Sequence, residues 1–266
     1  MKTKGERMWI DAHSHLADLR YSDLEIRSVL SRSRLQGVSL WIQGGVSPQD
    51  WKRQLHLTQN LDSGVIPCFG VHPEWVAQHS LGDVKEALSL LESMIHQSAG
   101  VGELGLDFRD QYVGQEDLQV WALEQQLQLA QAVKKPVVIH CVRAHGRLLE
   151  LLKERGNFAS GGLVHSFSGS LEVAQEYVKL GLLISVSGAV LKDRSERLKR
   201  AIKALPAEVL VIETDSPDQA IDASLNEPAN LIRIAQAVSA IKGIAFEKLL
   251  AESAERLKRL FKIDQV

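Results

Sequence analysis

The chain has 266 residues, of which 45% are hydrophobic and 24% are charged, and this composition excludes a disordered chain. Its net charge of −2 excludes a general electrostatic attraction to nucleic acid or anionic membranes, but local cationic side chains or bound metal ions could still hold a phosphate-bearing substrate. The two cysteines, Cys68 and Cys141, are too few for a disulfide framework, and no run of about eighteen apolar residues occurs, so we expect a cytoplasmic protein.

The chain begins with a charged stretch, residues 1–7, that lacks the apolar segment of a signal peptide. After it, short apolar β-like segments alternate with longer helical patterns. The predicted strands are Met8–His15, Val38–Gly44, Val65–His72, Gly100–Asp107, Pro136–Cys141, Gly162–Phe167, Leu182–Ala189 and Val209–Asp215. The predicted helices are Ser22–Gln36, Gln49–Leu61, Leu81–His96, Gln115–Val133, a segment ending at Arg155, Leu171–Leu180, Ser195–Leu205, Pro228–Lys242 and Phe246–Phe261.

Eight strand-then-helix units in a chain of this length are typical of a (β/α)8 barrel (TIM barrel), an α/β fold, and we expect residues 1–266 to form a single domain. A doubly wound open sheet fits the same alternation. The first βα turn, however, carries no G-x-G-x-x-G pattern, and no G-x-x-x-x-G-K-[ST] loop occurs in the chain, so nucleotide binding of the kind common in open sheets has no support.

Two histidines lie at the end of the first predicted strand, in Ile10-Asp11-Ala12-His13-Ser14-His15. Alternate side chains of a strand share a face, so His13 and His15 are predicted to project toward one point. Two imidazoles that meet in this way can begin a divalent-metal site. An isolated H-x-H is more often chance than a metal site, so the prediction depends on further ligands from elsewhere in the chain.

Ionisable residues recur at the carboxyl ends of the other predicted strands, where the functional residues of a barrel gather. They are His72, Glu103 with Asp107 on the same strand, His140 with His145 just beyond it, His165, and Glu213 with Asp215. Such groups at the ends of apolar strands are costly to bury unless they are paired or bind a metal. His56, His79 and His96 lie in helices or connections, where a solvated surface position is the ordinary interpretation.

Four histidines and two carboxylates are therefore predicted to bind metal: His13, His15, Glu103, His140, His165 and Asp215. This is more than one tetrahedral ion needs, and it suits two divalent ions that share a bridging carboxylate. Glu103 lies between the other ligands along the chain and is the predicted bridge. The ligand types fit Zn²⁺, Mn²⁺ or Ni²⁺, and the carboxylates leave Mg²⁺ open.

These motifs resemble those of the TatD-type metal-dependent deoxyribonucleases, a family of amidohydrolase-like barrel hydrolases. The similar stretches, in matching order from residue 9 to about 217, are I-D-A-H-S-H, G-V-H-P, G-E-L-G-L-D, V-I-H-C, V-H-S-F-S-G-S and E-T-D-S-P, followed by Asn226-Glu227-Pro228. The resemblance implies a (β/α)8 barrel with one or two divalent metals that hydrolyses phosphodiester bonds in DNA. No membrane partner is expected, and the oligomeric state is left open, a monomer included.

The resemblance also implies how the ligands are divided. One ion would be bound by His13, His15, Glu103 and Asp215, and the other by Glu103, His140 and His165. His72 falls where the family places a contact to the substrate phosphate.

Two departures from the family pattern affect this assignment. The family commonly has His-Ser-Arg after the strand-five histidine, whereas this chain has His140-Cys141-Val142-Arg143, with the arginine displaced by one position. Near the C-terminus the family often has an asparagine where this chain has Arg256, a change that we expect to alter packing more than chemistry.

Several roles have two interpretations. Asp215 is the predicted acceptor of the proton of the attacking water, with a purely structural metal ligand as the alternative. Glu213, on the same strand face, either supports the ligands or belongs to a buried ion pair. Arg143 and His145 are candidate substrate contacts or surface residues, and Trp75 either stacks an unpaired base or packs its loop.

The preferred function is a metal-dependent deoxyribonuclease, with exonuclease action expected, that uses a water activated by two metals. The alternative is a hydrolase of small lactones, amides or phosphoesters on the same barrel. Many such enzymes bridge two metals with a carboxylated lysine on strand four, where this chain has Glu103 and no lysine. A third hypothesis, a non-enzymatic scaffold with a vestigial site, is disfavoured because all six ligands are present.

Overall fold

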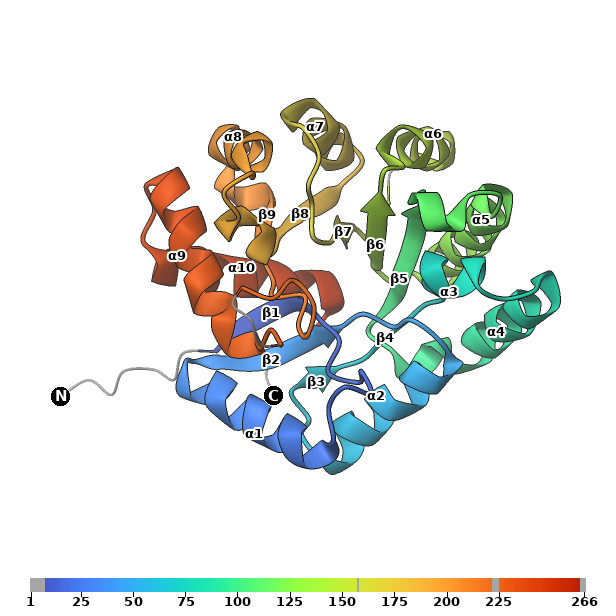
Figure 1. Cartoon of the computed structure of the whole chain (residues 1–266), viewed down its shortest axis with the longest axis horizontal. Coiled ribbons are helices and arrows are strands. Elements are labelled where there is room, and N and C mark those ends of the chain that lie inside the picture. The colour runs from blue at the N-terminus through green and yellow to red at the C-terminus, as the bar shows by residue number, and fades with distance from the viewer. Residues whose placement is uncertain (1–7, 157, 222–224, 264–266) are drawn as a thin grey trace.

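The computed structural model describes residues 8–156, 158–221 and 225–263; the charged stretch at residues 1–7 lies outside them. Within these ranges, short parallel strands form a central barrel and the helices lie around its outside (Figure 1). The strands are β1 (Trp9–Ser14), β2 (Val38–Gln43), β3 (Val65–Ile66), β4 (Cys68–Phe69), β5 (Gly100–Asp107), β6 (Val137–Val142), β7 (Gly162–Val164), β8 (Leu182–Val186) and β9 (Leu210–Ile212).

The α-helices are α1 (Asp23–Leu35), α2 (Pro48–Asn60), α3 (Pro73–Ala77), α4 (Leu81–Met94), α5 (Glu116–Val133), α6 (His145–Arg155), α7 (Leu171–Lys179), α8 (Glu196–Ala204), α9 (Leu231–Lys242) and α10 (Phe246–Phe261). Serine side chains begin several of them by accepting a hydrogen bond from the first turn. Ser22 and Ser80 form complete capping boxes with Glu25 and Asp83. None of the described helices is long and apolar enough to cross a membrane.

The strands close into a circle. β1, β2 and β3 pair in parallel, as do β4 to β9 in chain order, and Pro67 separates β3 from β4. The last strand returns to the first: the Asp215 amide donates to the His13 carbonyl at 2.9 Å, and the His15 amide donates to the Ser216 carbonyl at 2.7 Å. Since β3 and β4 occupy one strand position, eight positions surround the axis, and the predicted (β/α)8 barrel is confirmed.

The hydrophobic core has two parts because both faces of the strands are covered. The larger part lies between the strands and the surrounding helices. The smaller part joins alternate strand residues such as Ile10, Leu40, Val138 and Val211 with the C-terminal half of α10. β1 and β5, which carry His13 and Glu103, are buried along their whole length, so their polar side chains are held on rigid backbone.

The predicted strand Val65–His72 is wrong in its extent. Pro67 has no backbone N–H and interrupts the ladder, leaving only Val65–Ile66 and Cys68–Phe69 as strand. The chain then turns at Gly70, where a Cβ would lie 2.6 Å from the Gly102 Cα. His72 consequently caps the short helix α3, which the sequence analysis missed, rather than ending a strand.

Three later strands are also shorter than predicted, because their polar ends leave the ladder toward the barrel mouth. Ser166 and Asp215 have φ values of +43° and +59°, which no strand residue adopts. Ser187 begins a short 3₁₀ helix, Gly188–Leu191, after β8. The predicted helix start at Pro228 is a separate 3₁₀ turn, and α9 begins only at Leu231.

Candidate metal centre

The first two histidines of the site come from β1. Their Nε2 atoms lie 3.1 Å apart, so the alternation of the strand brings them to one point. Gly44, just after β2, provides the space beside them: a Cβ there would lie 2.3 Å from His13 Cε1 and 2.7 Å from His15 Cε1. The Gly44 carbonyl lies 3.1 Å from His15 Nδ1 and can accept its proton, which leaves Nε2 directed to the centre.

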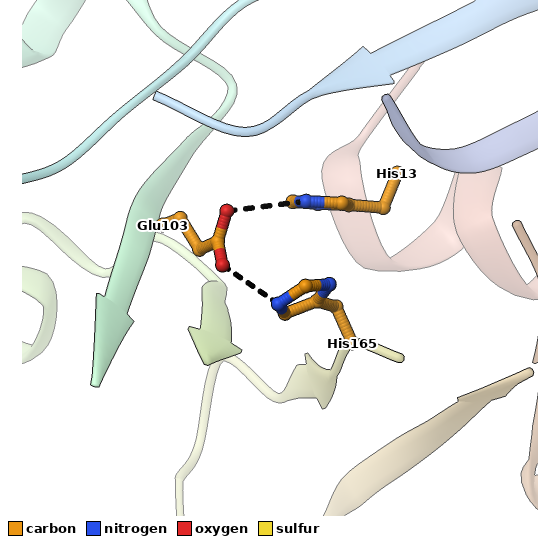
Figure 2. A group of neighbouring side chains, drawn as sticks. All are labelled: His13, Glu103 and His165. Atoms are coloured by element: carbon orange, nitrogen blue, oxygen red, sulfur yellow. Dashed lines mark ion pairs between the residues drawn. The ribbon is translucent and has the colours of Figure 1, made fainter. Parts of the chain in front are cut away.

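Glu103 on β5 lies between two groups of histidines. Its Oε2 is 3.2 Å from His13 Nε2 and 3.3 Å from His15 Nε2. Its Oε1 is within 3.2 Å of a nitrogen of three others: His165 (2.6 Å), His140 (2.8 Å) and His72 (3.2 Å). Figure 2 shows the carboxylate between His13 and His165, with one oxygen directed to each. One buried side chain thus connects five histidines.

Two glycines allow β5 to lie close enough to β6 for these contacts. Gly102 and Gly105 have φ values of +146° and +150°, and a Cβ at Gly105 would lie 1.9 Å from the His140 carbonyl oxygen. Together with Gly100 these glycines have the G-x-G-x-x-G spacing of a dinucleotide-binding turn. All three lie within β5, however, and not in a turn between a strand and a helix. Their role is steric, because they bring Glu103 within reach of His140.

Asp215, three residues beyond the end of β9, completes the group around β1. Its Oδ1 lies 3.5 Å from His15 Nε2 and 3.7 Å from His13 Nε2. The buried Asp11 holds this segment, because its carboxylate accepts hydrogen bonds from the amide and hydroxyl of Thr214. Burial raises the pKa of Asp11 to about 8. Asp11 has no predicted role, although its position two residues before His13 places it on the same strand face.

The donor set fits divalent cations. Two pairs of ring nitrogens face each other, 3.1 Å apart in His13–His15 and 3.0 Å apart in His140–His165, so at least one nitrogen of each pair presents a lone pair. Glu103 Oε2 is buried and has no hydrogen-bond partner among the described residues. Three overlapping groups have ligand atoms within 4.8 Å of one another: His13–Glu103–His165, His13–His15–Asp215 and His72–Glu103–His140. Imidazole nitrogens and carboxylate oxygens in this arrangement are suitable metal ligands.

The charges of the cluster are mutually dependent. Burial raises the pKa of Glu103, but the charges of His165, His72 and His13 outweigh burial and hold this pKa well below its usual value. Burial lowers the pKa of His165, but the charge and hydrogen bond of Glu103, together with Glu213 and Asp215, outweigh burial and raise this pKa well above its usual value. Burial raises the pKa of Asp215, but the hydrogen bond with His15 and the charges of the nearby histidines together outweigh it and lower this pKa. The cluster therefore keeps two ionised carboxylates among its histidines.

Asp107, at the end of β5, contacts His140 from the side away from Glu103. Its Oδ2 lies 3.1 Å from His140 Nε2, while His140 Nδ1 faces Glu103. Arg109 donates from Nε to both carboxylate oxygens at 2.9 Å. Burial raises the pKa of Asp107, but the bonds with His140 and Arg109 outweigh it and lower this pKa. Asp107 was predicted to lie at a strand end but was assigned no role, although residues 103 and 107 share a strand face.

Replacing Asp107 with asparagine is expected to weaken divalent-metal binding by about 10- to 100-fold while the barrel stays folded. An asparagine amide can donate to Nε2, which would favour the tautomer with its proton on Nδ1, the nitrogen that faces Glu103. Calorimetric titration of the metal-free protein with Zn²⁺ or Mn²⁺ measures this change. Asp117→Asn on the exposed side of α5 is the matched control. Equal affinities for the two variants would contradict the prediction.

Glu213 lies behind His165. Its carboxylate accepts hydrogen bonds from the Ser166 amide at 2.6 Å and from the Ser185 hydroxyl, and its Oε1 is 3.7 Å from His165 Nδ1. Among the described residues, no lysine or arginine pairs with it. Glu213 thus both supports the His165 segment and forms a buried ion pair with His165, so the two interpretations are compatible.

Other candidates lie away from the cluster. Arg143 is exposed and pairs with Asp110 at 2.8 Å. His145 is half-buried; its Nδ1 is 2.9 Å from the Tyr177 hydroxyl, and burial lowers its pKa to about 4. Within the described ranges, neither Arg143 nor His145 is hydrogen-bonded or ion-paired to the six predicted ligands. Cys141 is buried in the core.

Comparison with known proteins identifies the class of this barrel. The family model for TatD related DNase matches residues 10–262. The metal-dependent hydrolase YabD of Bacillus subtilis is 30% identical over 97% of this chain and 100% of its own length, and human deoxyribonuclease TATDN3 is 29% identical over 95% of this chain and 94% of its own. The crystal structure of YjjV, a TatD homologue from Escherichia coli K12, superposes with a TM-score of 0.87 and 29% identity, covering 96% of this chain and 98% of that one.

The fold and these relatives define a metal-dependent hydrolase that acts on ester bonds. The chain belongs to the TatD related DNase family, and the predicted family resemblance is confirmed.

Proposed function

We propose that this protein is a deoxyribonuclease that hydrolyses DNA from strand ends with two divalent ions, and that the chain acts as a single domain. The proposal rests on the position of Glu103, whose two oxygens face two separate groups of histidines. The human relative named deoxyribonuclease supports DNA as the substrate. The family resemblance supports phosphodiester chemistry.

The six ligands divide naturally around the Glu103 carboxylate. In the proposed arrangement, His13, His15, Asp215 and one oxygen of Glu103 hold one ion, and His140, His165 and the other oxygen hold the second. When bound, two such ions supply a hydroxide at neutral pH and stabilise the charge that develops on the phosphate. Zn²⁺, Mn²⁺, Ni²⁺ and Mg²⁺ are the candidate ions.

The remaining chemistry is assigned to side chains of this chain. Asp215 accepts the proton of the attacking water at Oδ1, the oxygen that faces His13 and His15. His72 contacts the substrate phosphate through Nε2, since its Nδ1 already accepts the Glu74 amide proton. Nε2 lies 3.2 Å from Glu103 Oε1, and the phosphate would replace that contact. Arg143 and His145, outside the cluster, bind the DNA backbone further along the mouth.

The decisive experiment measures cleavage of end-labelled single- and double-stranded DNA during a metal titration. Lactone, amide and small phosphoester substrates are assayed beside the DNA. Metal-dependent shortening of the labelled DNA supports the proposal. Protein that is loaded with metal but cleaves only small substrates would support the alternative hydrolase instead.

Removal of metal is expected to lower the thermal stability of the protein. Metal at about 100 times its Kd would add about 2.7 kcal/mol to the free energy of unfolding, which corresponds to roughly 5–10 °C in Tm for a domain of this size. Calorimetry before and after chelation measures the shift. His56→Asn, at an exposed position of α2, should leave the shift unchanged, whereas His140→Asn should reduce it. A Tm that changes neither when metal is added nor when it is chelated would contradict metal binding.

A further inference from the structure

A cavity of about 290 Å³ opens directly from the metal centre. One part of its wall is formed by two histidines of the cluster, His15 and His72. Another part is formed by Trp75 on α3 and by Gln78 at the end of this helix. A cavity of this size is at the small end of the range for ligand pockets and fits one nucleoside better than a longer segment. Because it adjoins the centre, whatever fills it lies next to the bond that is cleaved. We call it the end cavity.

The indole of Trp75 is a fixed, flat part of this wall. It stacks on the His79 ring at 3.7 Å between centroids with an interplanar angle of 16°, and His79 Nδ1 lies 2.7 Å from the Trp75 carbonyl. The ring is therefore held in place before any ligand arrives. Preformed aromatic surfaces of this kind bind unpaired bases without strong sequence preference.

The rest of the wall is acidic. Asp18, Asp50, Glu74 and Asp218 line the cavity, and none of its described lining residues is a lysine or arginine. Two arginines outside the lining offset part of this charge. Arg20 bridges Asp18 and Asp218 at 2.8 and 2.9 Å, and Arg109, bound to Asp107 at 2.6 Å, reaches Glu74 at 3.5 Å. A phosphate group in this cavity would meet an excess of carboxylates, and the arginines beside it are already paired with carboxylates.

Other cationic side chains at the mouth lie farther from α3. Lys192 follows β8 and contacts the neutral Gln219 at 3.0 Å, and Arg197 on α8 is close enough to His145 to lower its pKa. β8 and α8 lie across the barrel from α3, as Figure 1 shows. Among the described residues, no carboxylate is ion-paired with Lys192 or Arg197, whereas the two arginines beside the end cavity are paired, so the β8 side of the mouth suits phosphates better.

We propose that the end cavity receives the terminal nucleoside of a DNA strand with a free hydroxyl group, and that its carboxylates reject a strand end that carries a phosphate. The inference rests on the proposed function and adds to it a preference for one kind of strand end. The base lies against Trp75, the carboxylates accept hydrogen bonds from the sugar hydroxyl and base amino groups, and the phosphates of the remaining strand extend toward Lys192 and Arg197.

The test uses four single-stranded oligonucleotides of one sequence, with hydroxyl or phosphate at the 5′ and 3′ ends. On the metal-loaded protein, a phosphate at the degraded end should lower kcat/KM at least about tenfold, while a phosphate at the other end should have little effect. Glu74→Gln should reduce that penalty about threefold. Glu92→Gln, an equal change of charge on the outer face of α4, should leave it unchanged.

A second measurement tests the base. An oligonucleotide whose terminal nucleotide is abasic should be cleaved about tenfold more slowly by the wild type, and Trp75→Ala should remove most of this difference. Trp121→Ala, on α5 away from the mouth, is the control. Equal cleavage of hydroxyl and phosphate ends by all variants, or internal cleavage of circular DNA, would overturn the inference but leave DNA hydrolysis standing. Absence of cleavage in every oligonucleotide would instead overturn the proposed function.

Discussion

Replacing Glu103 with glutamine is expected to lower kcat/KM on DNA by about 10³-fold or more and to reduce the bound metal from two ions to at most one. Glutamine preserves the size of the side chain but presents only one oxygen, and its amide nitrogen cannot bind a cation. One of the two histidine groups would therefore face an amide N–H₂ group instead of a carboxylate oxygen. Metal analysis of the purified variant and cleavage of end-labelled DNA measure the two effects.

The Glu103 variant needs two controls. Glu86→Gln, at an exposed position of α4, carries the same chemical change and should retain full activity and metal content. Circular dichroism should show an intact barrel, because the substitution is isosteric. A folded Glu103→Gln protein that binds two ions and keeps its activity would show that Glu103 is no bridge.

Replacing Asp215 with asparagine is expected to lower kcat by about 10²- to 10⁴-fold with a much smaller effect on KM, because the variant cannot accept the proton of the attacking water. Asparagine is the suitable replacement, since Asp215 has a φ of +59° and asparagine adopts this conformation more readily than alanine does. Steady-state kinetics on a single-stranded oligonucleotide separate the two constants.

The pH dependence of this variant distinguishes the two roles of Asp215. If the carboxylate only held a metal, the variant would lose metal affinity and its residual rate would follow the wild-type pH profile. If it accepts the proton, the residual rate should keep rising with hydroxide concentration from about pH 7 to 9, where the wild type is level. Asp117→Asn should match the wild type in both respects.

Much of the architecture was predictable because it depends on local patterns. Apolar strands and serine-capped helices follow from spacing and turn chemistry, and the closed barrel follows from their number. The break at Pro67 and the helix after His72 also have local signals, since a strand proline interrupts the ladder and His72-Pro73-Glu74 places proline and an acidic residue in a first helical turn. The predicted strand was too long because apolar residues on both sides of Pro67 conceal the interruption.

The sequence was sufficient to predict which residues converge at the site, but not which atoms of these residues contact one another. Period-two spacing brings His13 and His15 together, and the barrel brings Glu103 and His165 toward them. That Glu103 Oε1 also meets His72 depends on a loop turned by Gly70, which no strand pattern describes. The surroundings of Arg143 likewise do not follow from the strand pattern, since its exposed side chain pairs with Asp110 outside the cluster.

The hydrogen bonds between the first and last strands determine when the site becomes complete during synthesis of the chain. Asp11 and Thr214 are 203 residues apart, and this contact forms only after nearly the whole chain has left the ribosome. Until then, the early histidines lack Asp215 and the closing strand that aligns it. Hydrolytic competence is therefore expected to arise in one late step, so that incomplete translation products do not attack nucleic acid.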